Sequence, residues 1–301
     1  MYKVLVADDV DPSGIKLLSE KKFLTIYKPG ISNESIFSDY NDFNILVIRS
    51  IRKIDRAFLD KVNFKLIATC SKGTDHIDIK YASLKKIKVI NAEEGNTVSA
   101  AEHTLALILN IYKGISISGN KIRKNKFSDT GFRRNELAGK TIGIIGYGKV
   151  GSKVGKICKA FGMKVLANDT DRSVIDKHRR IKFVKLKSLL EKSDIVTLHI
   201  PFNNKNSNFF SEEKFILLKN DCVFINTSRG GVVDEISLIK ILKSKKIRYA
   251  GLDVFKNEPL INPEFIGLHN TLLTNHTAGK TEESRIRISK FIFGKISKII
   301  E

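Results

Sequence analysis

Three side chains that can handle protons and carboxylates follow apolar, strand-like runs in the second half of the chain. They are Arg229, Glu258 and His276. A guanidinium can bind a carboxylate through two hydrogen bonds and polarise a neighbouring carbonyl. A carboxylate beside a histidine fixes the ring tautomer and stabilises the imidazolium, which makes the ring a proton donor. The set predicts that Arg229 anchors and polarises, His276 transfers the proton and Glu258 orients and charges His276.

A glycine motif at the start of this half predicts a cofactor. Gly146, Gly148 and Gly151 form G-x-G-x-x-G between an apolar run and a helical pattern. Such glycines allow a tight turn, close approach of a pyrophosphate and close helix packing, with the phosphates at the helix N-terminus. Asp169 ends the next apolar run, 18 residues after Gly151. A carboxylate there binds both ribose hydroxyls and repels a 2′-phosphate, so we expect NAD.

The remaining candidates near these strand ends are less specific. Asp253 ends an apolar run, where it could bind the nicotinamide carboxamide or cap a turn. We interpret the other histidines as ordinary core or surface residues; they are His76, His103, His178, His199 and His269. The sequence contains no metal-ligand spacing, so we expect no metal.

These side chains need a sheet whose strands end at one edge. We expect strands at 164–168, 194–200, 222–227, 249–255 and 271–275, after the glycine strand that begins at Thr141. Helix-like segments separate them, which is typical of a doubly wound parallel sheet of the Rossmann type. Ligands bind outside the carboxyl ends of such strands, where Arg229, Glu258 and His276 would lie.

The first 95 or so residues alternate strand and helix patterns in the same way. We expect strands at 3–7, 24–27, 45–48, 66–69 and 88–90, with amphipathic helices at 13–22 and 55–62. A capping box at Ser99–Glu102 predicts the start of a long helix through Tyr112, followed by a loop at Gly119–Gly139. The helical stretch 282–300 is expected to return to the first domain.

This pattern predicts an α/β protein with one domain inserted in another. We expect residues 1–98 plus 280–301 to form a discontinuous, flavodoxin-like substrate-binding domain. Residues 99–279 would form the inserted NAD-binding Rossmann domain. No apolar run reaches the roughly 18 residues of a membrane span.

The composition indicates the cellular compartment and the kinds of partner to expect. The chain has 301 residues, a net charge of +21 and three widely spaced cysteines, Cys70, Cys158 and Cys222. Odd, scattered cysteines in apolar surroundings indicate buried free thiols and a cytoplasmic protein. The charge could favour nucleic acid or anionic substrates, but it is spread through every segment without a nucleic-acid-binding motif. We therefore favour compositional bias and expect neither a nucleic-acid nor a membrane partner.

Together these motifs resemble the D-isomer-specific 2-hydroxyacid dehydrogenases over nearly the whole chain. The resemblance rests on the glycine loop and on the segments 47–50, 73–78, 95–97 with 101–102, 226–234, 251–259 and 276–279. It implies catalytic roles for Arg229, Glu258 and His276, and a homodimer with the helix at 99–112 in the interface. The nucleotide contacts that it implies fall on Lys149, Val150, Asp169, Ile200, Thr227, Ser228, Arg229, Asp253, His276 and Gly279.

Within that family the chain is most similar to the branch that oxidises 3-phosphoglycerate to 3-phosphohydroxypyruvate in serine biosynthesis. The expected partner is therefore a small anionic 2-hydroxy or 2-keto acid. Backbone N–H groups near Ser71 and Gly73 would hold its carboxylate, and nearby cations could hold a phosphate. The substrate-binding residues expected are Arg49, Ser50, Arg52, Ser71, Lys72, Gly73 and Arg229.

Some positions depart from the family pattern and leave alternatives open. The loop at 69–73 reads TCSKG where Arg-Ala-Gly-x-Gly is usual, and Glu93 and Asn275 stand where proline is common. Because the loop would touch the substrate, glyoxylate or hydroxypyruvate reductase and 4-phosphoerythronate dehydrogenase remain alternatives. A non-catalytic NAD(H)-sensing regulator is the alternative from another class, but it is disfavoured because Arg229, Glu258 and His276 are all present.

Overall fold

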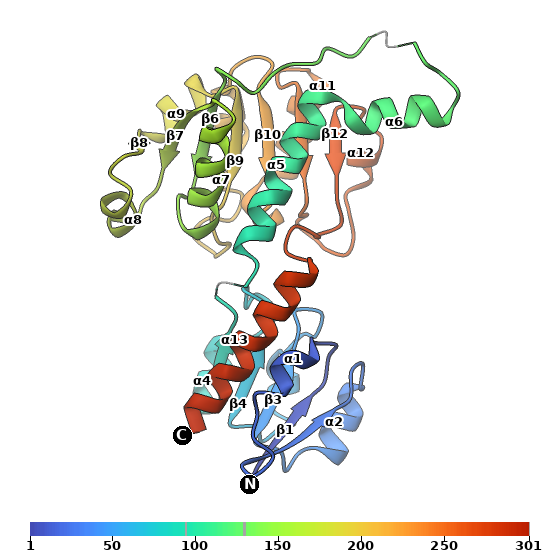
Figure 1. Cartoon of the computed structure of the whole chain (residues 1–301), viewed down its shortest axis with the longest axis vertical. Helices are drawn as coiled ribbons and strands as arrows, with labels where there is room; N and C mark the ends of the chain where they lie inside the picture. The colour runs from blue at the N-terminus through green and yellow to red at the C-terminus, as the bar shows by residue number, and fades with distance from the viewer. Residues whose placement is uncertain (94, 129–130, 301) are drawn as a thin grey trace. The chain divides into compact units, whose positions relative to one another are not determined.

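The computed structural model describes residues 1–93, 95–128 and 131–300. The chain divides into two compact units (Figure 1): residues 1–96 with 280–301 form the first, and residues 97–279 form the second. These boundaries lie within two residues of those expected from the sequence.

The first unit contains a five-stranded sheet in which every neighbouring pair is parallel, in the order β2-β1-β3-β4-β5. This is the flavodoxin-like order, with its topological switch point between β1 and β3. Both β3 and β4 are buried at every position, which explains why all their residues except Thr69 are apolar. The strands are β1 Tyr2–Val6, β2 Phe23–Tyr27, β3 Ile45–Ile48, β4 Leu66–Thr69 and β5 Lys88–Asn91.

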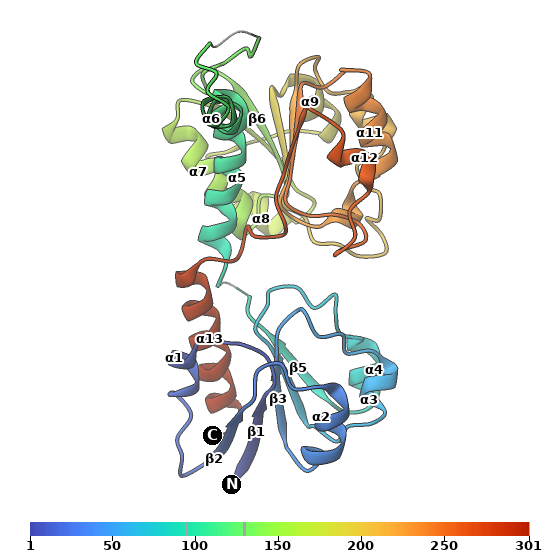
Figure 2. The same ribbon diagram turned by 90° about the vertical axis from the view of Figure 1, so that its right-hand side faces the viewer.

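Helices cover both faces of this sheet (Figure 2). On one face Ile36, Phe58 and Ala82 of three short helices pack in a core with alternate strand residues. On the other face the C-terminal helix packs Ile292 and Phe293 against the remaining strand residues. The helices are α1 Pro12–Ile15, α2 Asn33–Asp39, α3 Arg56–Leu59, α4 Ile79–Leu84 and α13 Glu282–Ile300.

The second unit contains a seven-stranded parallel sheet in the order β12-β11-β10-β9-β6-β7-β8. The chain reverses direction across the sheet between β6 and β9, as in a doubly wound Rossmann sheet, and this confirms the expected fold class. The strands are β6 Thr141–Ile145, β7 Lys164–Asn168, β8 Lys182–Phe183, β9 Ile195–Leu198, β10 Val223–Asn226, β11 Tyr249–Leu252 and β12 Thr271–Leu273.

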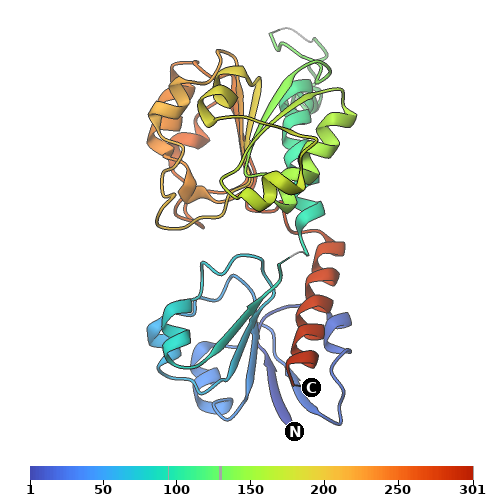
Figure 3. The ribbon, with the colours of Figure 1, turned by 90° about the vertical axis from the view of Figure 1, so that its left-hand side faces the viewer.

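Two helical layers enclose this sheet (Figure 3). One core contains residues of α5 and α7, and the other contains residues of α9, α10, α11 and α12. The helices are α5 Thr97–Lys113, α6 Ile115–Arg123, α7 Lys149–Ala160, α8 Arg172–Lys177, α9 Leu186–Lys192, α10 Glu212–Ile216, α11 Glu235–Lys243 and α12 Pro263–Ile266, with a 3-10 turn at Gly230–Val232. No helix of the described chain is both long and apolar enough to cross a bilayer.

Several sequence-based boundaries are wrong. Helix α5 begins at Thr97, so Ser99 lies buried inside its first turn and does not cap it. The expected loop at Gly119–Gly139 starts with a helix, because α6 continues to Arg123. The amphipathic segments 13–22 and 55–62 form only the short α1 and α3 followed by turns. The two-residue strand β8 was not expected, because it is too short for a periodic pattern.

Candidate active site

The glycine motif forms a tight turn from β6 into α7. Gly146 has a φ of +86°, and a Cβ there would lie 2.7 Å from the carbonyl oxygen of His199. A Cβ on Gly151 would lie 2.0 Å from the carbonyl oxygen of Gly146, so α7 packs directly on the turn. By contrast, a Cβ on Gly148 would meet no atom within 4 Å, and no side chain caps α7 there. The turn thus leaves open space over N–H groups at a helix N-terminus, which fits a pyrophosphate.

Asp169 is held beside this turn. It directly follows β7, and its Oδ2 accepts a hydrogen bond of 2.6 Å from the backbone N–H of Tyr147 inside the glycine motif. Its Oδ1 accepts one of 2.9 Å from the backbone N–H of Asp171. The carboxylate is therefore fixed at the end of the second strand, where the ribose of a dinucleotide would be recognised. Gly148 and Asp169 together fit NAD.

His276 and Glu258 form the closest polar contact among the expected catalytic residues. The Nδ1 atom of His276 lies 2.6 Å from Oε2 of Glu258. The other carboxylate oxygen accepts a hydrogen bond of 2.9 Å from the backbone N–H of Phe255. Burial opposes the charge of Glu258, but the hydrogen bonds from His276 and Phe255, together with the charges of His276 and Arg229, lower its pKa. The pair can therefore keep an ionised carboxylate against the ring.

Arg229 lies on a loop that packs against the loop of Glu258. It follows β10, and its carbonyl oxygen accepts a hydrogen bond of 2.9 Å from the side-chain amide of Asn226. A Cβ on the next residue, Gly230, would lie 1.9 Å from the carbonyl carbon of Phe255, so the two loops touch through their backbones. The structure thus places Arg229 near Glu258 and His276 at the carboxyl ends of β10, β11 and β12.

Asp253 has a supporting role that the sequence showed only in part. Its carboxylate is fully buried and accepts hydrogen bonds from the Thr274 hydroxyl at 2.6 Å and from the N–H groups of Thr277 and Ala278 at 2.8 and 2.9 Å. Burial would raise its pKa, but these hydrogen bonds and one from His103 lower the pKa to about 2. The Asp253 carbonyl oxygen also accepts the N–H of His276. Asp253 therefore holds the turn that carries His276, whose φ is +54°.

His103 was interpreted as an ordinary histidine, and its contact with this network was missed. Its Nε2 lies 3.1 Å from Oγ1 of Thr274 and 3.4 Å from Oδ1 of Asp253. The partners are about 150 residues or more away along the chain, so no local pattern shows the contact. Only its position on the α5 helix, several of whose side chains pack against the sheet, could have suggested it.

Known proteins are similar to this chain over nearly its whole length. The family model described as D-isomer specific 2-hydroxyacid dehydrogenase, NAD binding domain, matches residues 105–278. A D-3-phosphoglycerate dehydrogenase of Archaeoglobus fulgidus is 34% identical over 96% of this chain and 56% of its own length. The chain belongs to the D-isomer-specific 2-hydroxyacid dehydrogenase family.

Two other proteins match this chain along nearly their full length. A hydroxypyruvate reductase of Thermotoga maritima is 31% identical over 99% of this chain and 98% of its own. The crystal structure of a D-lactate dehydrogenase from Aquifex aeolicus, complexed with NAD and lactic acid, has a TM-score of 0.83 and 28% identity over 99% of this chain and 95% of its own. The chain spans just over half the length of the D-3-phosphoglycerate dehydrogenases that it matches.

The other nucleotide contacts implied by the family lie around the glycine turn and the strand ends. Lys149 and Val150 are the first two residues of α7. Ile200 follows β9, and its Cγ2 would lie 2.9 Å from a Cβ on Gly146. The structure also places Thr227 and Ser228 directly after β10, and Gly279 after the turn that carries His276. These contacts stay predictions, as do the site roles above.

The first-unit residues expected to bind substrate differ in the contacts that they make within the protein. The guanidinium of Arg52 is mostly buried and donates to Asp8, 2.8 Å away, and to the carbonyl oxygens of Ala7 and Ile31. Asp8 also accepts the N–H of Arg49 at 2.7 Å, so this buried pair shapes the loop after β3. Arg52 therefore has protein partners where the sequence suggested a phosphate ligand. The sequence signal that was missed is the Asp-Asp pair after β1.

The remaining first-unit candidates lie on exposed loops at the same edge of the sheet. Ser50 is exposed, and Arg49 lies 3.9 Å from Asp9. The Ser71 hydroxyl donates to the carbonyl oxygen of Gly73 at 2.7 Å, which stabilises the loop after β4. Lys72 is exposed, and its carbonyl oxygen accepts a hydrogen bond from Asn91.

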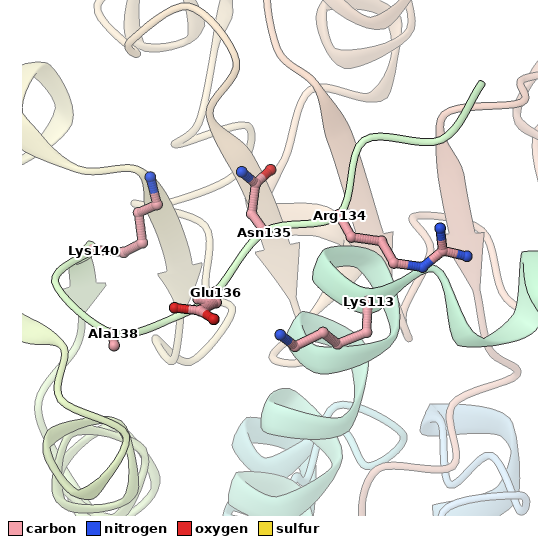
Figure 4. Close-up of a pocket in the computed structure, with 6 residues that line it drawn as sticks. All are labelled: Lys113, Arg134, Asn135, Glu136, Ala138 and Lys140. Atoms are coloured by element: carbon pink, nitrogen blue, oxygen red, sulfur yellow. The ribbon is translucent and has the colours of Figure 1, made fainter. Parts of the chain in front are cut away.

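A separate cavity of about 560 Å³ lies at the opposite edge of the second sheet. Figure 4 shows its lining, with Arg134 and Lys140 on opposite sides. Lys140 precedes β6 and Lys113 ends α5, so the cavity is at the amino end of β6, away from the glycine turn. Its lining has cations and one carboxylate but no nucleophile or histidine, so it does not compete as the active site; it comprises Lys113, Arg134, Asn135, Glu136, Ala138 and Lys140.

Proposed function

We propose that this chain is an NAD-dependent oxidoreductase that interconverts a D-2-hydroxy acid and its 2-keto acid. The observation that carries the proposal is the 2.6 Å contact between His276 and Glu258 at the carboxyl ends of a sheet whose glycine turn fits a dinucleotide. When bound, NADH supplies the hydride that reaches C2. The chain's own residues supply binding, charge and the proton.

The roles of these residues follow from their contacts. Nδ1 of His276 is engaged by Glu258, which leaves Nε2 to donate a proton to the substrate oxygen during reduction. In the oxidation direction the same nitrogen accepts the hydroxyl proton. Arg229 would pair with the substrate carboxylate and polarise the carbonyl beside it. General acid–base catalysis of this kind contributes roughly 10²- to 10⁴-fold in rate.

For the substrate, the sequence prediction is 3-phosphoglycerate and its product 3-phosphohydroxypyruvate. Relatives named D-3-phosphoglycerate dehydrogenase at 32–34% identity support it. A second candidate, reduction of unphosphorylated hydroxypyruvate or glyoxylate, is favoured by the engagement of Arg52 with Asp8. Because Arg52 is paired with Asp8, it is no longer available as one of the cations predicted to bind the substrate phosphate.

We further propose a homodimer in the cytoplasm. Ile115 and Ile122 on α6 and the nearby Phe127 are well exposed, and a second copy would cover them. Burial raises the pKa of the Cys158 and Cys222 thiols to about 12, so these free thiols stay protonated and suit a reducing compartment.

Isotope transfer tests the proposed reaction directly. Purified protein is incubated with NADH deuterated at nicotinamide C4 and, in turn, with phosphohydroxypyruvate, hydroxypyruvate and glyoxylate. For at least one of them we expect NADH oxidation and a product carrying deuterium at C2, with D configuration where C2 becomes chiral. Binding of NADH without consumption on any of the three would instead support the NAD(H)-sensing alternative and refute the proposal.

A further inference from the structure

Helix α5 contacts two strand ends of the second unit through successive side chains. The helix packs on β10 and β11. Oγ1 of Thr104 lies 2.8 Å from Oγ1 of Thr227, which directly follows β10. Nε2 of the preceding residue, His103, lies 3.1 Å from Oγ1 of Thr274, which directly follows β12. The first half of α5 is therefore fixed against the strand ends from which the candidate catalytic residues follow.

The direction of the hydrogen bonds between His103 and Asp253 follows from the protons available. Burial would raise the pKa of Asp253, but its hydrogen bonds lower the pKa to about 2, so the carboxylate is ionised and can only accept. The hydroxyl of Thr274 must therefore donate its single proton to Oδ1 of Asp253, 2.6 Å away. Its oxygen is left to accept from the ring, so Nε2 of His103 carries a proton.

The carboxylate at the end of this series holds the turn of His276. Asp253 accepts the backbone N–H groups of Thr277 and Ala278 at 2.8 and 2.9 Å, and its own carbonyl oxygen accepts the N–H of His276. His276 has a φ of +54°, which a residue with a side chain keeps only when its surroundings support it. The position of His276 therefore depends on where the Asp253 carboxylate is held.

His103 is itself held firmly enough to restrain this network. Its side chain is 21% exposed and that of Asp253 has no exposed surface, so water competes little for their hydrogen bonds. The hydroxyl of Thr104 donates to the carbonyl oxygen of Ala100 at 2.8 Å and so can only accept from Thr227. These bonds tie this part of α5 to the end of β10, and the ring keeps one position relative to the strand ends.

We propose that His103 is a positioning residue for proton transfer, which holds Thr274 and Asp253 in the arrangement that presents His276 to the substrate. This inference rests on the proposed function, because it concerns the proton donor of that reaction. In this role His103 acts through its two neighbours and not on the substrate. A misplacement of about 1 Å can lower the rate of a reaction roughly 10²-fold. Loss of His103 should therefore slow the reaction without removing its proton donor.

The kinetic test compares His103→Leu and His103→Gln with wild type on the best 2-keto acid of the panel. Leucine has no donor, whereas the glutamine amide can place an N–H group near the position of Nε2. We expect kcat of His103→Leu to fall by roughly tenfold, with smaller changes in KM and in the Kd for NADH. The kcat of His103→Gln should stay within about threefold of wild type. A role in packing alone predicts the opposite order, because leucine is the better buried residue.

Hydrogen exchange provides a readout that does not depend on turnover. In His103→Leu the backbone N–H groups of Thr277 and Ala278 should exchange at least about fivefold faster than in wild type, because the carboxylate that accepts them is less restrained. Exchange in β6 and β9 should stay unchanged, which separates a local effect from a loss of global stability.

Thr274→Val removes the same hydrogen bond from its other end. It should lower kcat and speed exchange in the same direction, and it provides the test if His103→Leu does not fold. In the Thr274→Val background, a further His103→Leu substitution should lower kcat by less than about twofold, since the bond that it removes is already lost.

His269→Leu is the matched control. His269 is an exposed histidine of the same unit, and it lies shortly before β12, at the amino end of that strand. The same substitution there should leave kcat and the exchange of Thr277 and Ala278 within about twofold of wild type.

Other results overturn the role of His103 while the dehydrogenase stands. They are a kcat of His103→Leu within about twofold of wild type, a His103→Gln variant impaired as strongly as His103→Leu, and unchanged exchange of the Thr277 and Ala278 N–H groups. A wild-type protein that reduces no 2-keto acid refutes the proposed function and with it the part of His103 in catalysis. Exchange alone then decides whether His103 holds the turn.

Discussion

At the scale of single residues, the acid–base site depends on a second layer that fixes His276. Asp253 has no exposed surface, yet its carboxylate stays ionised because the Thr274 hydroxyl and two N–H groups of the turn donate to it. The position of Asp253 at a strand end was readable from the sequence. Its partners were not, because hydrogen bonds across 21 to 25 residues leave no periodic pattern.

The low pKa of Asp253 predicts a specific acid sensitivity. Its pKa is about 2 in the fold against an ordinary value of 3.8, so ionised Asp253 stabilises the second unit above about pH 4. This contribution, about 2 kcal/mol, is lost as the pH falls through the folded pKa. In Asp253→Asn we expect a lower free energy of unfolding at pH 7 and a weaker dependence on pH between 4 and 2. Denaturant unfolding at several pH values measures both, and equal pH slopes for variant and wild type would contradict this role.

At the scale of elements, two glycines in the turn from β6 into α7 are needed for different reasons. Gly151 is required by packing, since a Cβ there would collide with the backbone of Gly146. Gly148 is not, because its surroundings within the chain are empty. The motif was found from the sequence because its spacing is local, and the structure adds which glycine serves the ligand and which serves the fold.

A substitution at Gly148 should therefore weaken cofactor binding without unfolding the protein. In Gly148→Ala we expect the Kd for NADH to rise by roughly tenfold or more, since the added methyl takes space expected for the pyrophosphate. The melting temperature should stay near that of wild type. Gly267→Ala is the control, because Gly267 has an ordinary φ of −77° and its nearest neighbour to a Cβ is 3.8 Å away. An unchanged Kd in Gly148→Ala would remove the turn from the binding site.

At the scale of the whole molecule, apolar patterning predicts most of the fold but not its irregular parts. Buried strands such as Ile45–Ile48 and Leu66–Thr69 have the expected bounds, because most of their consecutive buried residues are apolar. Helix α6 was missed because none of its residues is buried and because Gly119 lies inside it, which weakens a helical pattern. Arg52 was assigned to the substrate because its buried partner, Asp8, is 44 residues away in the chain.

The net charge of +21 is spread along the whole chain and is not concentrated in one segment of the sequence. A field of that sign raises the association rate of any anionic ligand, including NADH and a 2-keto acid. It does not select among anions, so selectivity must come from local groups in the binding site. Membership in the family indicates the type of reaction, whereas the relatives' names differ in substrate.

The most direct test of the central claim is the steady-state rate of NADH oxidation by His276→Ala, with the best 2-keto acid of the panel. We predict that kcat falls by roughly 10²- to 10⁴-fold, while the Kd for NADH changes far less than kcat does. Glu258→Gln should fall less, and His269→Ala, which changes an exposed histidine of the same unit, should keep the wild-type rate. A His276→Ala variant that retains kcat within twofold of wild type would contradict the account.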